Sequence, residues 1–279
     1  MIVVTGATGN VGRPLVRMLA AAGAEVTAVS RTAAGELPAG VRHVAADLTD
    51  TDSLAPAFAG ADALYLLFAP GSFHADVRGL LAAAAAAGVR RVVLQSSQGV
   101  ATRPESPSHG QLGKAIEDAV RASGLSWTIL RPGGFQSNAL AWAARVRAER
   151  EVSAPFGEVA IPFVDPEDIA AVAAAALRED GHDGQIYVLT GPVAESPRER
   201  VRALSEALGE PVRFLDQSPA QARTELLAIM PPDVADTTLA ILGAPTDAEQ
   251  RISPDIERVL GRAPRRFAAW AQRTVAAFR

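Results

Sequence analysis

Three glycines near the start of the chain have the type and spacing of a phosphate-binding turn. Gly6, Gly9 and Gly12 follow a short apolar run, residues 2–5, and a helical pattern of apolar residues begins at Val11. Glycine lets a backbone approach a ligand closely, and a helix start offers free N–H groups and the positive end of its dipole. The pattern therefore predicts a strand, a turn that binds a pyrophosphate, and a helix.

The residues beside this turn narrow its interpretation. Asn10 is the expected N-cap of the helix, and Pro14 lies in the first helical turn, where proline is tolerated. Gly12 is followed by Arg13 and Pro14 rather than by Lys-Ser or Lys-Thr, which excludes a P-loop. A dinucleotide is thus the expected ligand.

Arg31 indicates which dinucleotide this is. The second expected strand covers residues 25–30, and in dinucleotide folds an acid at its end binds the ribose 2′-hydroxyl of NAD. Arg31 stands there instead, and a guanidinium suits a 2′-phosphate, which a carboxylate would repel. An ordinary surface arginine is the alternative, but beside the glycine turn we favour NADP(H).

Composition and charge exclude several classes of protein. The 279 residues are 48 % hydrophobic and 21 % charged, as in a soluble globular protein, and the net charge of −4 without a basic block excludes a nucleic-acid partner. The absence of cysteine removes disulfides and thiolate chemistry and favours a reducing cytoplasm. The four scattered histidines predict no metal site. The apolar runs are too short to span a membrane, and we expect no signal peptide before the first strand.

The elements that must position these residues alternate over the first 131 residues. We expect strands at 2–5, 25–30, 41–46, 63–68, 91–97 and 126–131. Between them we expect helices after the glycine turn and at 51–58, 73–87 and 109–120. Such alternation predicts an α/β fold, a Rossmann-type doubly wound parallel sheet with right-handed crossovers.

The pattern changes beyond Pro132. We expect a helix at 135–150, a short strand at 159–164, a helix that starts within 165–168, and a last sheet strand at 185–190. A mostly helical region follows, with helices expected at 197–208, 220–229, 235–242, 254–260 and 264–277, and one strand at 212–215. We therefore expect a Rossmann-type domain over residues 1–190, with its core in 1–150. Residues 191–279 would form a smaller helical C-terminal lobe that contributes to a substrate pocket.

Five stretches together resemble the NmrA-like branch of the atypical short-chain dehydrogenases/reductases. They are Thr5-Gly-Ala-Thr-Gly-Asn-Val-Gly12, Ser30-Arg31, Trp127-Thr-Ile-Leu-Arg-Pro-Gly-Gly-Phe135 with Asn138, Val164-Asp-Pro-Glu-Asp-Ile-Ala170, and Leu189-Thr-Gly-Pro192. The resemblance covers essentially the whole chain and implies NADP(H) as cofactor. The family includes NADPH-dependent quinone, azo-dye and triphenylmethane-dye reductases, and also redox sensors that bind NADP without turning it over.

The resemblance also implies a set of cofactor-binding residues. Those at the pyrophosphate would be Gly6, Thr8, Gly9, Asn10, Val11 and Gly12, and Arg31 would bind the 2′-phosphate. Asp47 and Leu48 would approach the adenine, although capping of the following helix is the alternative for Asp47. The residues that flank the nicotinamide riboside or wall its pocket would be Phe68, Ala69, Pro70, Ser96, Pro132 and Phe135.

The expected catalytic residue is Lys114, which matches a functional lysine of the related isoflavone-reductase type. Most short-chain dehydrogenases carry Tyr-x-x-x-Lys, in which the lysine lowers the pKa of the proton-donating tyrosine. Here Gly110 occupies the tyrosine position, and core packing explains the two tyrosines, Tyr65 and Tyr187, better. A helical ion pair with Glu117 or Asp118 is the alternative role for Lys114.

Three functions fit these observations. The first is an NADPH-dependent reductase, an oxidoreductase that transfers a hydride to a small, flat, electron-poor acceptor such as a quinone, a dye or an aromatic polyketide. The second is an NADP-binding sensor or scaffold, and the third is a non-redox tailoring enzyme that uses the same pocket. We expect a small-molecule substrate and no membrane partner, and we leave a homodimer open. Asp168 is assigned to the start of its helix rather than to catalysis.

Overall fold

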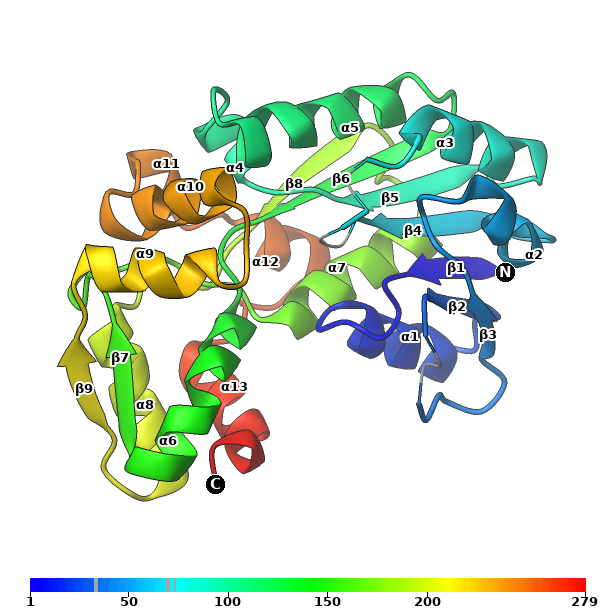
Figure 1. Ribbon diagram of the computed structural model, residues 1–279. Coiled ribbons are helices and arrows are strands. Elements are labelled where there is room, and N and C mark those ends of the chain that lie inside the picture. The colour runs from blue at the N-terminus through cyan, green and yellow to red at the C-terminus, as the bar shows by residue number, and fades with distance from the viewer. Residues whose placement is uncertain (33–34, 69–70, 73) are drawn as a thin grey trace. The chain divides into compact units, whose positions relative to one another are not determined.

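The computed structural model describes residues 1–32, 35–68, 71–72 and 74–279. The chain forms two compact units, each made of three segments (Figure 1). The first contains Met1–Ser97, Leu112–Pro132 and Pro166–Val188, and the second contains Gln98–Gln111, Gly133–Asp165 and Leu189–Arg279. The last change of unit thus falls beside residue 190, whereas two earlier segments also belong to the second unit. The division into domains 1–190 and 191–279 stays a prediction.

The first unit is built on a seven-stranded sheet with the order β3-β2-β1-β4-β5-β6-β8 among the described residues. Its strands are β1 (Ile2–Thr5), β2 (Val26–Ser30), β3 (Arg42–Ala45), β4 (Ala63–Leu67), β5 (Arg91–Gln95), β6 (Ser126–Pro132) and β8 (Gln185–Leu189). The pairings that join β1 to β6 are parallel. The predicted Rossmann-type sheet is therefore confirmed, because the strand order reverses direction at β1 as it does in doubly wound folds.

Helices cover both faces of this sheet. They are α1 (Gly12–Ala21), η1 (Thr51–Leu54), α2 (Ala55–Phe58), α3 (Val77–Ala86), α5 (Leu112–Arg121) and α7 (Pro166–Arg178). Helix α1 packs against α7 on one face, and α3 packs against α5 on the other (Figure 1). Helix α3 begins where the Asp76 side chain accepts a hydrogen bond from the Gly79 N–H, which satisfies one of the first amides of the helix.

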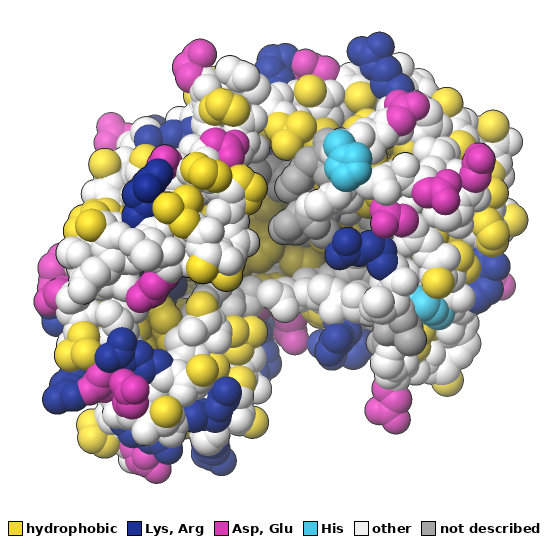
Figure 2. All heavy atoms as spheres, in the orientation of Figure 1, with side chains coloured by type: hydrophobic (Ala, Val, Ile, Leu, Met, Phe, Trp, Pro, Cys, Tyr) yellow, Lys and Arg dark blue, Asp and Glu magenta, His cyan; other side chains and the backbone are white. Residues whose placement is uncertain are grey.

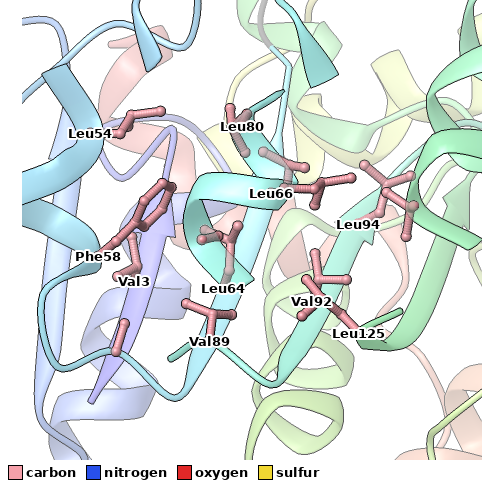
Figure 3. Packing of buried hydrophobic residues seen from close by; sticks show 14 of the residues in the cluster. Val3, Leu54, Phe58, Leu64, Leu66, Leu80, Val89, Val92, Leu94 and Leu125 are labelled. Carbon is pink, nitrogen blue, oxygen red and sulfur yellow. The ribbon is translucent and has the colours of Figure 1, made fainter. Parts of the chain in front are cut away.

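The core of the first unit lies between the sheet and its helices. Leu64, Leu66, Val92 and Leu94 project from the central strands toward the α2 and α3 side, where Phe58 meets them (Figure 3). These side chains are almost fully buried, and each such burial stabilises the fold by about 1.5–3 kcal/mol. Continuous apolar strands are what a parallel sheet covered on both faces requires.

The second unit is mostly helical. Its elements are α4 (Gly99–Thr102), a π-helical turn η2 (Pro107–Gln111), η3 (Gln136–Trp142), α6 (Ala143–Glu149), β7 (Glu151–Ala154), α8 (Pro197–Leu208), β9 (Arg213–Asp216), α9 (Pro219–Leu227), α10 (Pro232–Gly243), α11 (Asp247–Gln250), α12 (Asp255–Leu260), α13 (Phe267–Thr274) and η4 (Val275–Phe278). Helix α8 has the predicted bounds, because a capping box between Ser196 and Glu199 starts it and Gly209 ends it in the left-handed conformation.

One expected strand is missing, and one strand is unexpected. The predicted strand at 159–164 does not form, and among the described residues Ile161 forms only an isolated antiparallel bridge with Glu195. Pro162 follows Ile161 and has no N–H to donate, so the ladder cannot continue. The strand β7 was not predicted. It pairs in parallel with β9, more than fifty residues further along the chain, in a separate two-stranded sheet.

Candidate active site

The glycine turn closes on its own backbone. The N–H of Gly9 donates to the carbonyl oxygen of Gly6 at 2.9 Å, and a Cβ on Gly12 would lie 2.1 Å from the same oxygen. Gly6 has a φ of +62°, and a Cβ there would lie 2.8 Å from the Leu67 side chain at the end of β4. A side chain at position 12 would therefore open the turn, and one at position 6 would displace Leu67 and strain the backbone. Gly9 is exposed, so the backbone is accessible, which fits a pyrophosphate.

Asn10 is not the N-cap of α1. Val11 holds that position, and no side chain caps the helix there. The reason is that helical hydrogen bonding begins at the turn itself, where the N–H of Arg13 donates to the carbonyl oxygen of Gly9 at 3.0 Å. This arrangement suits an anion, because a helix that begins without a side-chain acceptor presents its positive end to a ligand. Thr8 is partly buried and Asn10 exposed in the same turn.

Arg31 and Asp47 lie at the carboxyl ends of the neighbouring strands β2 and β3. Arg31 is exposed directly after β2, and Asp47 accepts hydrogen bonds of 2.9 Å from the N–H and the hydroxyl of Thr49. These two bonds, aided by the positive charge of Arg31, lower the pKa of the Asp47 carboxyl. Asp47 thus closes the loop that leads to η1, while Asp50 caps that helix. Leu48 packs against the core of the unit.

The next two strand ends carry Phe68 and Ser96. Phe68 is buried after β4, and Ser96 is partly buried after β5, which is the neighbour of β4. Because parallel strands end at one edge of the sheet, these residues stand at the same edge as the glycine turn. Ala69 and Pro70 lie outside the described residues. The first unit therefore brings the described candidates at the ends of β1, β2, β3, β4 and β5 to one edge.

Ser96 also leads to a buried ionic network that the sequence did not reveal. Glu117 on α5 is 0 % exposed, and its carboxylate accepts a hydrogen bond of 2.7 Å from the Ser96 hydroxyl. Arg131 of β6 donates two further bonds, 2.8 and 2.6 Å long, and Arg121 donates one of 2.7 Å. Burial favours the protonated form, yet the bonds from Arg131 and Ser96 outweigh it and lower the pKa of Glu117. A signal existed in the chain, since Arg131 is the next-to-last residue of an apolar strand and needs a counterion.

Lys114 points into an ion pair. Its Nζ lies 2.5 Å from the Asp118 carboxylate, one turn further along α5, and its side chain is 63 % exposed. Asp118 in turn accepts from Arg121 at 3.0 Å. The helical pair named above as the alternative role for Lys114 is thus present, and exposed pairs of this kind contribute only a few tenths of a kcal/mol.

Pro132 and Phe135 belong to different units. Pro132 is the buried last residue of β6, in the first unit. Phe135, in the second unit, precedes η3 and forms an isolated parallel bridge with Val164. Their role at a nicotinamide pocket stays a prediction.

The two tyrosines are core residues, as expected. Tyr65 is fully buried in β4, its hydroxyl donates to the side-chain oxygen of Gln95, and burial raises its pKa. Tyr187 is 4 % exposed in β8, with its hydroxyl 2.8 Å from Nδ1 of His182.

Asp168 is fully buried in the first turn of α7, where the helix dipole favours its charge.

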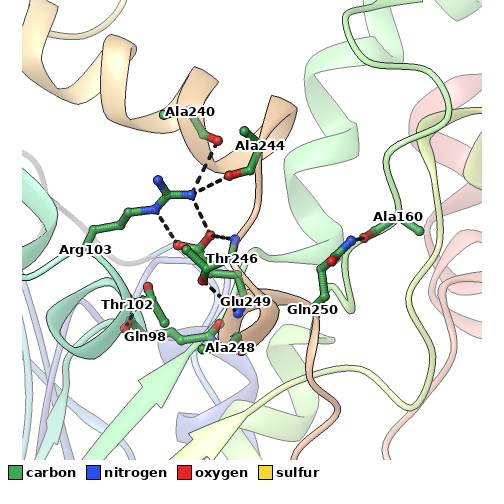
Figure 4. A network of polar contacts seen from close by, with 10 residues as sticks. All are labelled: Gln98, Thr102, Arg103, Ala160, Ala240, Ala244, Thr246, Ala248, Glu249 and Gln250. Atoms are coloured by element: carbon green, nitrogen blue, oxygen red, sulfur yellow. Dashed lines mark hydrogen bonds and ion pairs between the residues drawn. The ribbon is translucent and has the colours of Figure 1, made fainter.

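Gly110, which occupies the position of the tyrosine in Tyr-x-x-x-Lys, has no room for a side chain. A Cβ on Gly110 would lie 2.1 Å from the carbonyl oxygen of Arg103 and 2.6 Å from that of Pro104. The loop that carries these carbonyls is fixed from α10 and α11, because the Arg103 guanidinium donates to Glu249 at 2.8 and 2.7 Å and to the carbonyl oxygen of Ala244 (Figure 4). A tyrosine cannot stand at position 110 without moving this loop.

The surface gives no sign of a single-sign patch on the face drawn in Figure 2, where acidic and basic side chains are interspersed. No group of three or more potential metal ligands occurs among the described residues. In the same part of the chain, no helix combines the length and the apolar character that a membrane crossing requires.

Comparison with known proteins identifies relatives along the whole chain. A family described as NAD(P)H-binding matches residues 6–180. A (4-alkanoyl-5-oxo-2,5-dihydrofuran-3-yl)methyl phosphate reductase of Streptomyces griseus is 38 % identical over 100 % of this chain and 99 % of its own. An NAD(P)H azoreductase of Xenophilus azovorans is 36 % identical with the same coverage. The NADPH complex of quinone oxidoreductase QOR2 from Escherichia coli superposes with a TM-score of 0.79 at 25 % identity, covering 98 % of this chain and 99 % of that one.

Proposed function

The chain belongs to the NAD(P)H-binding family, in the NmrA-like branch of the atypical short-chain dehydrogenases/reductases, and on that premise we propose that it reduces a small, flat, electron-poor organic acceptor with NADPH. By their names, one of these relatives is a furanone phosphate reductase, the second is an azoreductase and the third is a quinone oxidoreductase. These acceptors share a conjugated electron-poor system that can take up a hydride. We also propose a cytoplasmic location, because a chain without cysteine suits a reducing compartment.

The observation that carries this proposal is the closure of the glycine turn. Side chains at Gly6 and Gly12 would collide with the Leu67 side chain and with the turn's own backbone, while Gly9 stays exposed at the start of α1. Few ligands require a bare backbone at a helix start, and a pyrophosphate is one of them. Arg31, exposed at the end of β2, supports NADP(H) over NAD(H).

Different residues of this chain would bind different parts of the cofactor. Residues Gly6 to Gly12 would hold the pyrophosphate, Arg31 the 2′-phosphate, and Asp47 with Leu48 the adenine side. Phe68 and Ser96 would flank the nicotinamide riboside, and Pro132 and Phe135 would wall the pocket and exclude water. When bound, NADPH supplies the hydride. Lys114 would bind the nicotinamide ribose hydroxyls and keep the local field positive.

The acceptor class follows from what the chain lacks. Gly110 holds no tyrosine, and Tyr65 is buried with a raised pKa, so neither position offers a phenol as proton donor. A quinone, an azo group or an unsaturated lactone disperses the incoming negative charge itself, and water or Lys114 can supply the proton. Orientation and exclusion of water would then provide most of the rate acceleration.

The test is to follow NADPH oxidation by its near-ultraviolet absorbance with three acceptors: a quinone, an azo dye and an alkanoyl butenolide. We expect turnover with at least one acceptor, and a product two hydrogens heavier by mass spectrometry. Tight NADPH binding without any turnover would favour the sensor, and a changed acceptor with unchanged NADPH would favour the non-redox enzyme.

A further inference from the structure

Glu117 fixes the hydrogen-bonding direction of Ser96. A serine hydroxyl has one proton to donate and two lone pairs that accept. The Glu117 carboxylate has no proton to give, because three bonds from Arg131 and Arg121 hold it in the charged form. The Ser96 hydroxyl must therefore be the donor in the 2.7 Å bond to Oε1 of Glu117.

The carboxylate has no acceptor capacity left for a second arrangement. Oε1 of Glu117 accepts from Ser96 and from Nε of Arg131, and Oε2 accepts from the terminal nitrogens of Arg131 and Arg121. Four donors occupy the roughly four lone-pair sites of the two oxygens. A fully satisfied buried network of this kind is rigid, since any rotation would leave a buried charge without its partner.

The lone pairs of Ser96 are what remains for a ligand. Ser96 is partly buried, and within the part of the chain that the structure describes no side chain donates to its Oγ. It follows β5 at the edge of the sheet that carries the glycine turn, two strands away across β4. Adjacent strands lie about 4.8 Å apart, so Ser96 stands about 10 Å from the turn, within the reach of one dinucleotide.

We propose that Glu117 is a positioning residue that commits Ser96 to accept a hydrogen bond from the nicotinamide half of the cofactor. The inference rests on the proposed function, in which Ser96 flanks the nicotinamide riboside. Ser96 accordingly recognises an N–H or O–H group, either the carboxamide or a ribose hydroxyl, and does not deliver the proton of the reaction.

The first test measures NADPH dissociation constants without an acceptor, for the parent, Ser96→Ala and Ser96→Thr. We expect Ser96→Ala to weaken binding about two- to tenfold, the effect of one neutral hydrogen bond, and Ser96→Thr to restore it, because the hydroxyl returns. The turnover number at saturating NADPH should change by less than about threefold. A loss of a hundredfold or more in turnover with unchanged binding would make Ser96 the proton donor and overturn the proposal.

Cofactor analogues distinguish the two donors. The 3-acetylpyridine analogue of NADPH lacks the carboxamide N–H, and analogues with a 2′-deoxy or a 3′-deoxy nicotinamide ribose each lack one hydroxyl. If Ser96 accepts from one of these groups, Ser96→Ala will lose nothing with the analogue that lacks it and will keep its loss with the others. A loss that persists with all three analogues contradicts the proposal.

The role of Glu117 is tested by its coupling to Ser96. Glu117→Gln should weaken NADPH binding in the parent but add no further loss in the Ser96→Ala background, because both changes remove the same contact, that of Ser96 with the cofactor. Asp118→Asn is the matched control on the same helix, since it weakens the exposed pairs with Lys114 and Arg121 and removes no bond in which Glu117 takes part. Additive losses would overturn the assignment. If Glu117→Gln does not fold, the Ser96 variants and the cofactor analogues still test the proposal. If the parent turns over and the Ser96 variants bind NADPH as well as the parent does, this inference is rejected while the proposed reductase function stands.

Discussion

Gly110 lies so close to the backbone of Arg103 that any side chain at this position would displace it. A Cβ would stand 2.1 Å from the Arg103 carbonyl oxygen, and that carbonyl belongs to a loop tied to Glu249 by its own side chain. The tyrosine that most short-chain dehydrogenases use is therefore excluded by packing as well as missing from the sequence.

Gly110→Ala should consequently destabilise the protein. The obstructing atoms are backbone carbonyls that cannot rotate away, so we expect a loss of about 1–3 kcal/mol in the free energy of unfolding, the cost of overpacking. Urea denaturation measures it. Gly79→Ala is the control, because its Cβ would meet only the Asp76 carboxylate, which caps α3 but can turn aside. The lost cap and the helix preference of alanine should nearly cancel, so the net change should be small. Equal losses in both variants would contradict this account.

Arg31→Ala should change the choice of cofactor. Loss of a charge-assisted bond to the 2′-phosphate should weaken NADPH binding by about 1.5–3 kcal/mol and leave NADH almost unaffected. Isothermal titration with both cofactors measures the difference. Arg90→Ala serves as control, because Arg90 is an exposed arginine that pairs with Asp62. Similar losses for NADPH and NADH would place Arg31 away from the phosphate.

Asp168→Asn should affect stability and not chemistry. The buried carboxylate sits in the first turn of α7, where its charge favours the helix, so the expected loss is about 1 kcal/mol in the free energy of unfolding. Turnover per folded molecule should stay close to that of the parent. A large drop in turnover with an unchanged melting temperature would show that Asp168 takes part in the reaction.

Glu117 should make the fold sensitive to acid. Its folded pKa lies below the usual value, so the unfolded chain binds more protons at low pH. The stability that this group contributes is complete above the unfolded pKa of about 4.3 and disappears as the pH falls through the lower folded pKa. Denaturation measured between about pH 6 and about pH 3 should thus show a shallower acid loss in Glu117→Gln than in the parent. Parallel curves would mean that folding does not lower the pKa of Glu117.

Lys114→Met tests the proposed catalytic lysine. If Lys114 leaves its exposed pair with Asp118 to bind the nicotinamide ribose, the variant should raise the Michaelis constant for NADPH and lower turnover about ten- to a hundredfold. Steady-state kinetics measures both. Asp118→Asn frees the lysine and should not reproduce the loss. Parent-like kinetics in Lys114→Met would leave the surface ion pair as its only role.

Local patterns in the sequence determined most of the first unit. Apolar runs bounded by turns predicted the strands β1 to β6 to within a residue or two, and the glycine turn predicted a cofactor site at the start of α1. The bounds of α8 followed from Ser196, Glu199 and Gly209, because caps act within one helical turn. These features are local, so the residues that cause them stand next to the elements they define.

Only the tertiary structure decided which distant residues meet. The pairing of β7 with β9 joins segments on either side of α7 and α8, and nothing in four residues such as Glu151 to Ala154 specifies a partner so far along the chain. Likewise Ser96, Glu117 and Arg131 come from a strand end, a helix and another strand. In the sequence alone, Glu117 cannot be told from the other charged residues of an amphipathic helix. Its burial, its charge and its bond to Ser96 exist only because α5 packs on β5 and β6, which brings two guanidinium groups to a carboxylate that water no longer reaches.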